Sequence, residues 1–211
     1  MKYNGPGRLI LLLVLPAVGC AGSRSSIRNH EVPAKAHARD IIKDYYPLRI
    51  GNTWTYEVNT LGEKTEQVIT VDRKDGKFFH LSGGAGGLIY RDGYGIRDMH
   101  RYILRFPVKL GGNWESILSP DSIEYYEVTA VGKKVSVPAG SFDGCVEVLS
   151  KHSIDKTKTL VNRMTFAPGV GLVKIETELH QQGKNPVPQV VLRLARYKVA
   201  PSELPKVVKG K

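Results

Sequence analysis

The chain has 211 residues, of which 24% are charged and 41% are hydrophobic, and its formal net charge is +11. This composition is typical of a folded protein, and the length allows one good core or two small ones. The longest basic runs are dipeptides and no nucleic-acid-binding motif occurs, so we expect no nucleic-acid partner. We expect the positive charge to attract anionic headgroups or cell-wall polymers, or only to maintain solubility.

The first twenty residues predict export. Lys2 and Arg8 give a basic start, residues 9–15 are apolar without interruption, and small residues precede Cys20. The apolar run is far below the roughly 20 residues that span a bilayer and fits the core of a signal peptide. The sequence AVGC at residues 17–20 resembles the bacterial lipobox, which implies cleavage before Cys20 and its acylation by fatty acids such as palmitate. An ordinary signal peptide with an incidental cysteine is the alternative.

Lipid on Cys20 would fix the mature protein to a membrane, because several acyl chains make the attachment effectively permanent. In bacteria with two membranes, Ala21 resembles an outer-membrane address. Removing residues 1–19 as the signal peptide takes away two basic residues, which leaves a mature net charge of +9. Residues 20–44 are then the lipidated cysteine and a flexible tether, because they lack a sustained apolar period.

The second cysteine of the mature chain has no partner if the first carries lipid. We therefore predict no internal disulfide and a buried, inert Cys145. A catalytic thiol is the alternative, and it would need a nearby histidine such as His152.

From residue 45 onward, short runs of alternating polarity are separated by Gly, Asp, Asn and Pro, which predicts antiparallel β-structure. Trp54, Tyr56 and Val58 alternate with polar residues and give a strand with one apolar face. Asp75-Gly76 predicts a hairpin, because glycine adopts the positive φ of a tight turn. The glycine-rich residues 83–87 precede a strand rather than a helix, so a mobile hairpin loop is favoured over a phosphate site.

A nine-residue pattern occurs twice, sixty residues apart. Residues 46–54 read YPLRIGNTW and residues 106–114 read FPVKLGGNW. The shared positions include Pro47, Gly51 and Trp54 in the first copy and Pro107, Gly111 and Trp114 in the second. This predicts a duplicated β module. We expect the tryptophans and the aliphatic pair of each copy to be buried, and the glycine to allow the bend between them.

The second half continues the β pattern to residue 199. A strand over residues 123–131 is expected to turn at Gly132-Lys133, and the corners at residues 138–142 and 167–171 each lead to a new strand. Glu124 and Glu127 are interpreted as solvated surface on opposite sides of their strand. We predict one β-rich domain over residues 45–200, with repeats at about 45–104 and 105–200, and a disordered tail over residues 201–211.

Three stretches together resemble a group of uncharacterised bacterial lipoproteins. They are PLRIGNTWTY at residues 47–56, VPAGSFDGC at residues 137–145 and PGVGLVK at residues 168–174. The resemblance covers about residues 45–199, and its motifs are structural, so it implies relatives without implying an activity. More loosely, the meander is similar to the open half-barrels of periplasmic lipoprotein carriers, which is an analogy of fold alone.

The densest group of polar side chains lies between residues 91 and 101. Its members are Arg91, Asp92, Arg97, Asp98, His100 and Arg101. They could form a polar site if they converged on a concave face, and a solvent-facing hairpin of opposed charges is the other interpretation. The histidines are scattered without zinc-site spacing, and no calcium loop or serine-hydrolase elbow occurs. We therefore predict no metal, no cofactor and no catalytic residue.

These observations predict one all-β domain. We expect an antiparallel meander of about nine or ten strands, duplicated and curved into an open half-barrel, with a β-sandwich as the fallback. The favoured function is a non-enzymatic, membrane-anchored envelope lipoprotein that binds a lipid or other amphiphile on the curved sheet. The alternative is a structural or assembly partner of another envelope protein or of a cell-wall polymer. A hydrolase is a third hypothesis, which a cleft holding His100 or His152 beside a carboxylate would favour.

Overall fold

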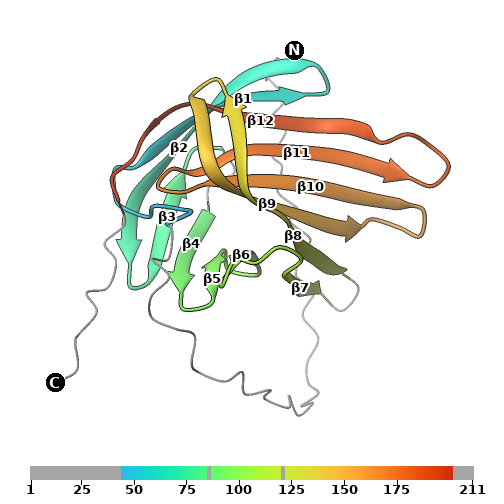
Figure 1. The fold of residues 1–211 in the computed structure, drawn as a ribbon, viewed down its shortest axis with the longest axis horizontal. Coiled ribbons are helices and arrows are strands. Elements are labelled where there is room, and N and C mark those ends of the chain that lie inside the picture. The colour runs from blue at the N-terminus through green and yellow to red at the C-terminus, as the bar shows by residue number, and fades with distance from the viewer. Residues whose placement is uncertain (1–43, 85–86, 120–121, 202–211) are drawn as a thin grey trace, which may run out of the picture. The chain divides into compact units, whose positions relative to one another are not determined.

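The computed structural model describes residues 44–201 except residues 85–86 and 120–121. These residues form twelve β-strands and no helix, which confirms the all-β prediction (Figure 1). Within the described part, nothing helical is long and apolar enough to cross a membrane. The predicted signal peptide, Cys20, nearly all of the tether and residues 202–211 lie outside the described residues.

The strands vary in length from three to sixteen residues. In chain order they are β1 (Thr53–Thr60), β2 (Glu63–Asp75), β3 (Phe78–Ser82), β4 (Gly87–Asp92), β5 (Gly95–Arg97), β6 (Tyr102–Arg105), β7 (Asn113–Ser119), β8 (Ser122–Val137), β9 (Gly140–Ser153), β10 (Lys158–Ala167), β11 (Gly171–Gln181) and β12 (Val187–Lys198).

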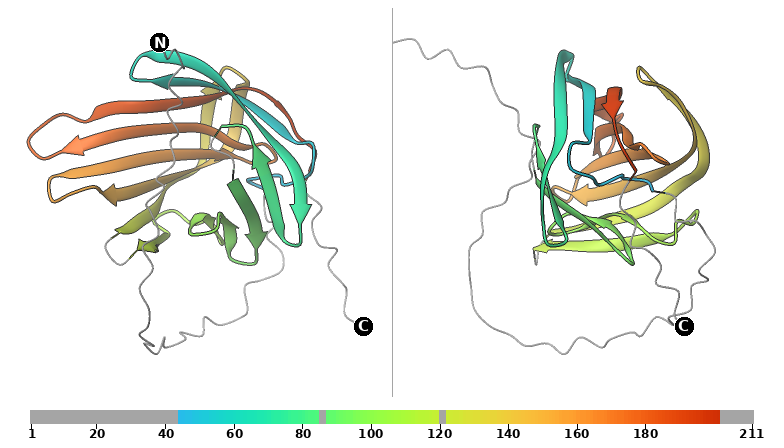
Figure 2. Two further views of the ribbon diagram at one scale, coloured as in Figure 1. Left: turned by 180° about the vertical axis from the view of Figure 1, so that it is seen from behind. Right: turned by 90° about the vertical axis from the view of Figure 1, so that its left-hand side faces the viewer.

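All twelve strands belong to one antiparallel sheet with the order β6-β5-β4-β3-β2-β1-β12-β11-β10-β9-β8-β7. The first half of the chain forms the meander β1–β6 and the second half forms the meander β7–β12. The two meanders join where β1 pairs with β12. The edge strands are therefore β6 and β7, although they follow each other in the chain. Figures 1 and 2 show the curvature that brings these two edges near each other.

Side chains bridge the two edges, and no backbone ladder joins described residues of β6 and β7. Nε1–H of Trp114 on β7 donates to the carbonyl of Tyr102 on β6 at 2.8 Å. Arg101, which precedes β6, donates from Nη1 to Oε1 of Glu124 on β8 at 3.0 Å. The sheet is thus a nearly closed barrel, and we call the junction between β6 and β7 the seam.

The two segments with the shared sequence pattern form the same backbone hydrogen bonds. In each segment, the glycine N–H donates to a carbonyl of the neighbouring strand. The residue after the glycine donates its N–H to the carbonyl three positions earlier, and its own carbonyl accepts an N–H from the neighbouring strand. The bonds are Gly51 N to Val71 O (2.9 Å), Asn52 N to Arg49 O (3.1 Å) and Val71 N to Asn52 O (2.9 Å), and Gly111 N to Val128 O (2.9 Å), Gly112 N to Lys109 O (2.9 Å) and Val128 N to Gly112 O (2.8 Å). Gly51 and Gly111 have φ values of 87° and 73°, which explains why both positions are glycine.

Three expectations from the sequence differ from the structure. The sheet has twelve strands rather than nine or ten, because β5 and β6 have three and four residues and are too short to show alternation. Gly132 does not end a strand but lies at a β-bulge inside β8. Ile50 and Leu110 are 58% and 71% exposed rather than buried, because each lies in the turn beside its glycine.

The concave side of the sheet is filled by side chains of the same chain. Tyr45, Tyr46 and Leu48 precede β1, and all three are buried in one cluster with residues from both meanders. The hydroxyl of Tyr45 donates to the carbonyl of Gly144 on β9 at 3.3 Å. Three strands of the sheet separate β1 from β9, so this segment crosses the concave side. The core therefore lies inside the curve.

Candidate functional site

The structure disperses the six polar residues at 91–101 over both faces of the sheet. Asp92 and Asp98 accept backbone N–H groups two and three residues later, and so shape the turns that follow β4 and β5. Arg91 and Arg97 lie on opposite faces, because Arg97 pairs directly with Tyr90, the neighbour of Arg91 on β4. The structure brings together only Asp98 and Arg101 as an ion pair among the six.

Arg101 joins the turn before β6 to the interior of β8. Its Nε donates to Asp98 at 2.8 Å and its Nη1 donates to Glu124 at 3.0 Å. Burial acts to lower the pKa of Arg101, but the hydrogen bond to Asp98 and the charge of Glu124 raise it overall, so the guanidinium stays charged. Glu124 also accepts a hydrogen bond from the hydroxyl of Tyr126. The surface interpretation of Glu124 is wrong, because this carboxylate is buried at the seam, whereas Glu127 is exposed.

His152 is the histidine that lies nearest to Glu124 in the pairing of β8 with β9. It is buried on β9 directly opposite Glu124, and its Nδ1 has no hydrogen-bond partner among the described residues. This is a histidine–carboxylate arrangement of the kind that would favour an enzyme. However, the carboxylate of Glu124 is already held by Arg101 and Tyr126, and neither pocket described below is lined by His152.

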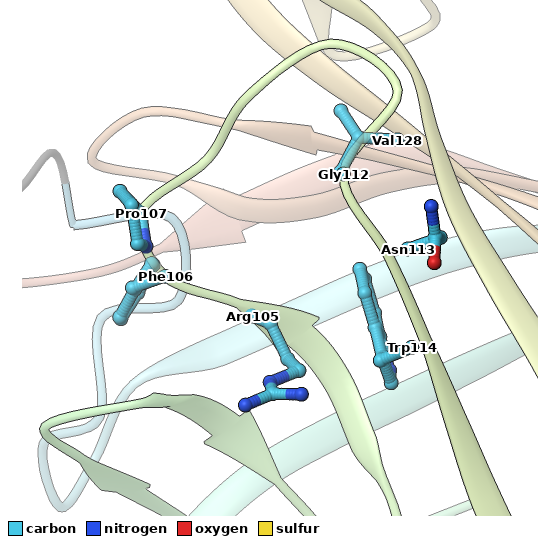
Figure 3. A pocket seen from close by; sticks show the side chains of 7 residues that line it. All are labelled: Arg105, Phe106, Pro107, Gly112, Asn113, Trp114 and Val128. Carbon is cyan, nitrogen blue, oxygen red and sulfur yellow. The ribbon is translucent and has the colours of Figure 1, made fainter. Parts of the chain in front are cut away.

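A pocket of about 140 Å³ lies beside the second repeated segment (Figure 3). Its lining consists of Arg105, Phe106, Pro107, Gly112, Asn113, Trp114 and Val128. Figure 3 shows Phe106 and Pro107 on one side and Asn113 and Trp114 on the other. In the first segment the position of Gly112 is taken by Asn52, whose amide donates to the carbonyls of Pro47 and Ala200 at 2.7 and 3.0 Å. The pocket thus occurs beside the copy that lacks this side chain.

A second pocket of about 320 Å³ lies over the outer face of β7, β8 and β9. Its lining consists of Asn113, Trp114, Glu115, Tyr125, Tyr126, Glu127, Leu149 and Lys151. Pockets for small ligands typically have volumes of about 300–1,000 Å³. Both pockets therefore lie at or below the lower end of that range.

Cys145 is buried, as predicted, and burial raises the pKa of its thiol. A raised pKa keeps the thiol protonated and unreactive. Within residues 44–201, apart from the two short gaps, no three His, Cys, Asp or Glu side chains lie together in a way that could hold a metal ion.

A row of rings and cations on the outer face of β3–β6 is the largest feature that sequence reasoning missed. We call it the basic–aromatic ladder, and it consists of Lys77, Phe78, Tyr90, Arg97, Tyr102 and Arg105. The rings of Phe78 and Tyr90 meet edge to face at 4.9 Å, and Nζ of Lys77 lies 4.4 Å from the centre of the Tyr90 ring. The guanidinium of Arg97 lies 5.3 Å from Tyr90 and 4.7 Å from Tyr102, and that of Arg105 lies 5.4 Å from Tyr102.

Strand register places these side chains on the outer face. Ile96 and Leu104 pair with each other and enter the core, so the next residue on each strand points outward. A bulge then pairs Arg97 with Tyr102, two residues before Leu104, which brings the Tyr102 ring to the face of Arg97. The sequence signal is the alternation of aromatic and basic residues in short runs, but it becomes a surface only when the register and the bulge are known.

Comparison with known proteins shows fold-level likeness only. No protein-family model and no curated protein sequence matches the chain. Among solved structures, the chain is similar to a Bacteroides fragilis protein described as exported and as having a YmcC-like fold, with 17% identity over 72% of this chain and 98% of that chain, and a TM-score of 0.43. It is also similar to a Parabacteroides distasonis protein described as a lipoprotein, with 13% identity over 73% of this chain and 98% of that chain, and a TM-score of 0.39.

Proposed function

We propose that the chain is an exported, non-enzymatic envelope lipoprotein, anchored by acyl chains on Cys20, that binds another component of the envelope on its outer surface. The basic start, the short apolar run and the cysteine after small residues support the anchor. The described domain begins at residue 44, so the tether of residues 20–44 would separate the lipid from the sheet.

The observation that carries the choice of the outer surface is the filled concave side. Tyr45, Tyr46 and Leu48 occupy the curve of the sheet, where a lipid carrier would need a groove. The ring of Tyr46 lies 5.4 Å from that of Trp54, and the Trp54 Nε1–H donates to the carbonyl of Val170 at 2.7 Å. These contacts support a closed interior, and they favour the partner-binding function over an amphiphile held inside the sheet.

The anchor is tested on protein purified from native membranes. Mass spectrometry is expected to find a mature chain that begins at an acylated Cys20, and the variant Cys20→Ser is expected to leave the membrane fraction. A mature amino terminus at another residue, without lipid, would contradict the anchor.

The binding mode is tested by cross-linking in living cells. A photo-cross-linking residue at exposed Tyr94 is expected to give a defined adduct, and one at buried Leu194 is expected to give none. The same membranes are extracted and the purified protein is examined for bound lipid. A stoichiometric amphiphile released only on unfolding, together with no surface adduct, would favour the amphiphile-binding function instead.

A further inference from the structure

We propose that the basic–aromatic ladder docks on an anionic lipid bilayer, so that the domain lies against the membrane that carries its anchor. The inference rests on the proposed function, because it names the envelope component that the outer surface contacts. It is carried by three observations: the charge of the ladder, the exposed side chains at its border, and the length of chain between the anchor and the domain.

The cations of the ladder form no direct ion pair among the described residues, although Asp92 lies on the same face and acts electrostatically on Arg97. Lys77, Arg97 and Arg105 stack on rings, and no ion pair involves any of them in the part of the chain that the structure describes. On the other half of the sheet, many cations are paired. These pairs are Lys133–Glu147, Arg163–Glu147, Lys174–Glu176, Arg193–Glu57 and Arg196–Glu66. The cationic groups of the ladder are therefore free of direct ion pairs and can meet an external anion.

The acidic groups on this face leave the ladder with a positive balance. Asp92 uses its carboxylate within the protein, since it accepts from the amides of Tyr94 and Gly95 and from the hydroxyl of Tyr102 at 2.8–3.0 Å. Asp75 is exposed in the turn before Lys77. Asp92 keeps its negative charge in these hydrogen bonds, so two carboxylates accompany three cations, which leaves this face with a net charge of +1.

Exposed apolar side chains border the ladder. Tyr94 is 62% exposed in the turn after β4, and Met99 is 48% exposed in the turn after β5. The β4–β5 turn, which carries Tyr94, lies at the same end of the strands as the β2–β3 turn, which carries Lys77; both turns are on the lower side of the sheet in Figure 1. Aromatic side chains favour the boundary between headgroups and acyl chains, where an apolar ring and a polar tip are both satisfied.

The tether enters the domain at β4, one of the strands that contribute to the ladder. Asp44, the first described residue, pairs with Arg91 on β4 at 3.2 Å, on the face of the strand opposite Tyr90 of the ladder. A segment from Cys20 to Asp44 spans roughly 80 Å at most, so it allows the ladder to reach the surface that holds the lipid. A bilayer satisfies both the cations and the exposed rings, whereas a soluble polyanion satisfies only the cations.

The test uses the chain from residue 20 to residue 211 with Cys20→Ser, so that no acyl chain contributes. Binding is measured to phosphatidylcholine vesicles with and without about one third phosphatidylglycerol. The unaltered ladder is expected to bind only the anionic vesicles and to be released by salt. Replacing Lys77, Arg97 and Arg105 by Gln is expected to weaken binding roughly 100-fold, since each cation near an anionic surface contributes about a factor of five.

The matched control replaces Lys64, Lys151 and Lys198 by Gln. These three lysines are exposed, lie outside the ladder and have no ion pair among the described residues, so the control has the same net charge as the ladder variant. It is expected to bind within roughly threefold of the parent. Circular dichroism and thermal melts of both variants show whether they are folded. If the two variants lose binding equally, or if neither does, the ladder is not the docking surface.

A second pair of variants separates the ring from the charge. Tyr94→Ser is expected to weaken vesicle binding severalfold, and Tyr125→Ser on the outer face of β8 is expected to leave it unchanged. Binding to soluble polyphosphate through the ladder without binding to vesicles would overturn the bilayer in favour of a polymer. The two proposals fail independently. This variant cannot be acylated, so a failure to bind vesicles does not contradict the Cys20 anchor. Conversely, a mature terminus at another residue does not contradict vesicle binding by the ladder.

Discussion

The two repeated segments have the same backbone hydrogen bonds but different surroundings. In the first, Trp54 is fully buried and donates to the carbonyl of Val170, in the turn between β10 and β11. In the second, Trp114 donates across the seam to Tyr102 and stacks on Tyr126 with ring centres 5.2 Å apart. One local structure thus closes the interior in its first copy and holds two sheet edges together in its second.

The difference shows that the pattern specifies a turn and an inward tryptophan, while the position in the sheet decides what the tryptophan stabilises. The first segment lies where β1 joins the two meanders, far from either edge. The second precedes β7, which is an edge strand beside a pocket. Residues around an edge strand can rearrange to fill a cavity more easily than residues packed in the middle of the sheet.

The largest expected effect compares the two tryptophans. Trp54→Ala is expected to lower the free energy of unfolding by about 4–5 kcal/mol, because it leaves a large cavity and an unpaired carbonyl at Val170. Trp114→Ala is expected to cost about 3 kcal/mol, because its surroundings are partly open. Urea denaturation measures both. If Trp54→Ala does not fold, Trp54→Phe and Trp114→Phe give the same comparison, and equal losses would contradict the asymmetry.

The seam itself is tested at Arg101. Arg101→Met is expected to lower the free energy of unfolding by about 2–3 kcal/mol, because it leaves the carboxylate of Glu124 buried without its cation. This is the lower end for a broken buried ion pair, since Arg101 is partly exposed. The control is Arg163→Met, which is expected to cost less than about 1 kcal/mol because Glu147 keeps Lys133. Adding Glu124→Gln to Arg101→Met is expected to recover part of the loss in thermal melts. No recovery would show that Arg101 acts only through packing.

Strand identity could be predicted from the sequence because alternation and turn residues are local signals. The alternation at Trp54 and Tyr56 and the Asp75-Gly76 turn have their expected structures. The pairing of β1 with β12 could not be predicted, since nothing local in β1 specifies a partner more than a hundred residues away. Much of the fold class was therefore predictable, but the closure of the sheet was not.

The site was harder to predict than the fold for the same reason. Glu124 has the sequence context of a surface carboxylate, and it becomes a buried ion-pair partner only because β8 lies beside the seam. Tyr102 joins the basic–aromatic ladder only because a bulge shifts the register of β6. Both features depend on how distant strands meet, which composition and periodicity do not encode.

A smaller effect is expected at Asn52, which has no side-chain counterpart in the second segment. Its carboxamide is buried and makes three hydrogen bonds, two of them to the backbone of Ala200. Asn52→Ala is expected to lower the free energy of unfolding by about 2 kcal/mol, because buried backbone groups lose their partners. The control Asn59→Ala removes an exposed bond to Gly62 and is expected to cost about 0.5 kcal/mol. Equal losses would mean that residues near Ala200 are not held by Asn52.

The smallest effect concerns pH and the position where the segments differ by one hydroxyl, Tyr46 in the first and Phe106 in the second. Burial raises the pKa of Tyr46 to about 12. Its neutral form is therefore favoured in the folded state, so this contribution to stability is fully present below about pH 10, the pKa in the unfolded chain, and is lost as the pH rises through 12. Between pH 10 and pH 11 the loss is expected to be about 1 kcal/mol.

Tyr46→Phe makes the first segment match the second at this position and removes one titrating group. Denaturation at pH 8, 10 and 11 is expected to show a shallower loss of stability in this variant than in the parent. Some alkaline sensitivity is expected to remain, because burial also raises the pKa of Tyr56 well above its ordinary value. An unchanged slope for Tyr46→Phe would mean that Tyr46 reaches water in the folded state, and the concave side would then not be closed at this segment.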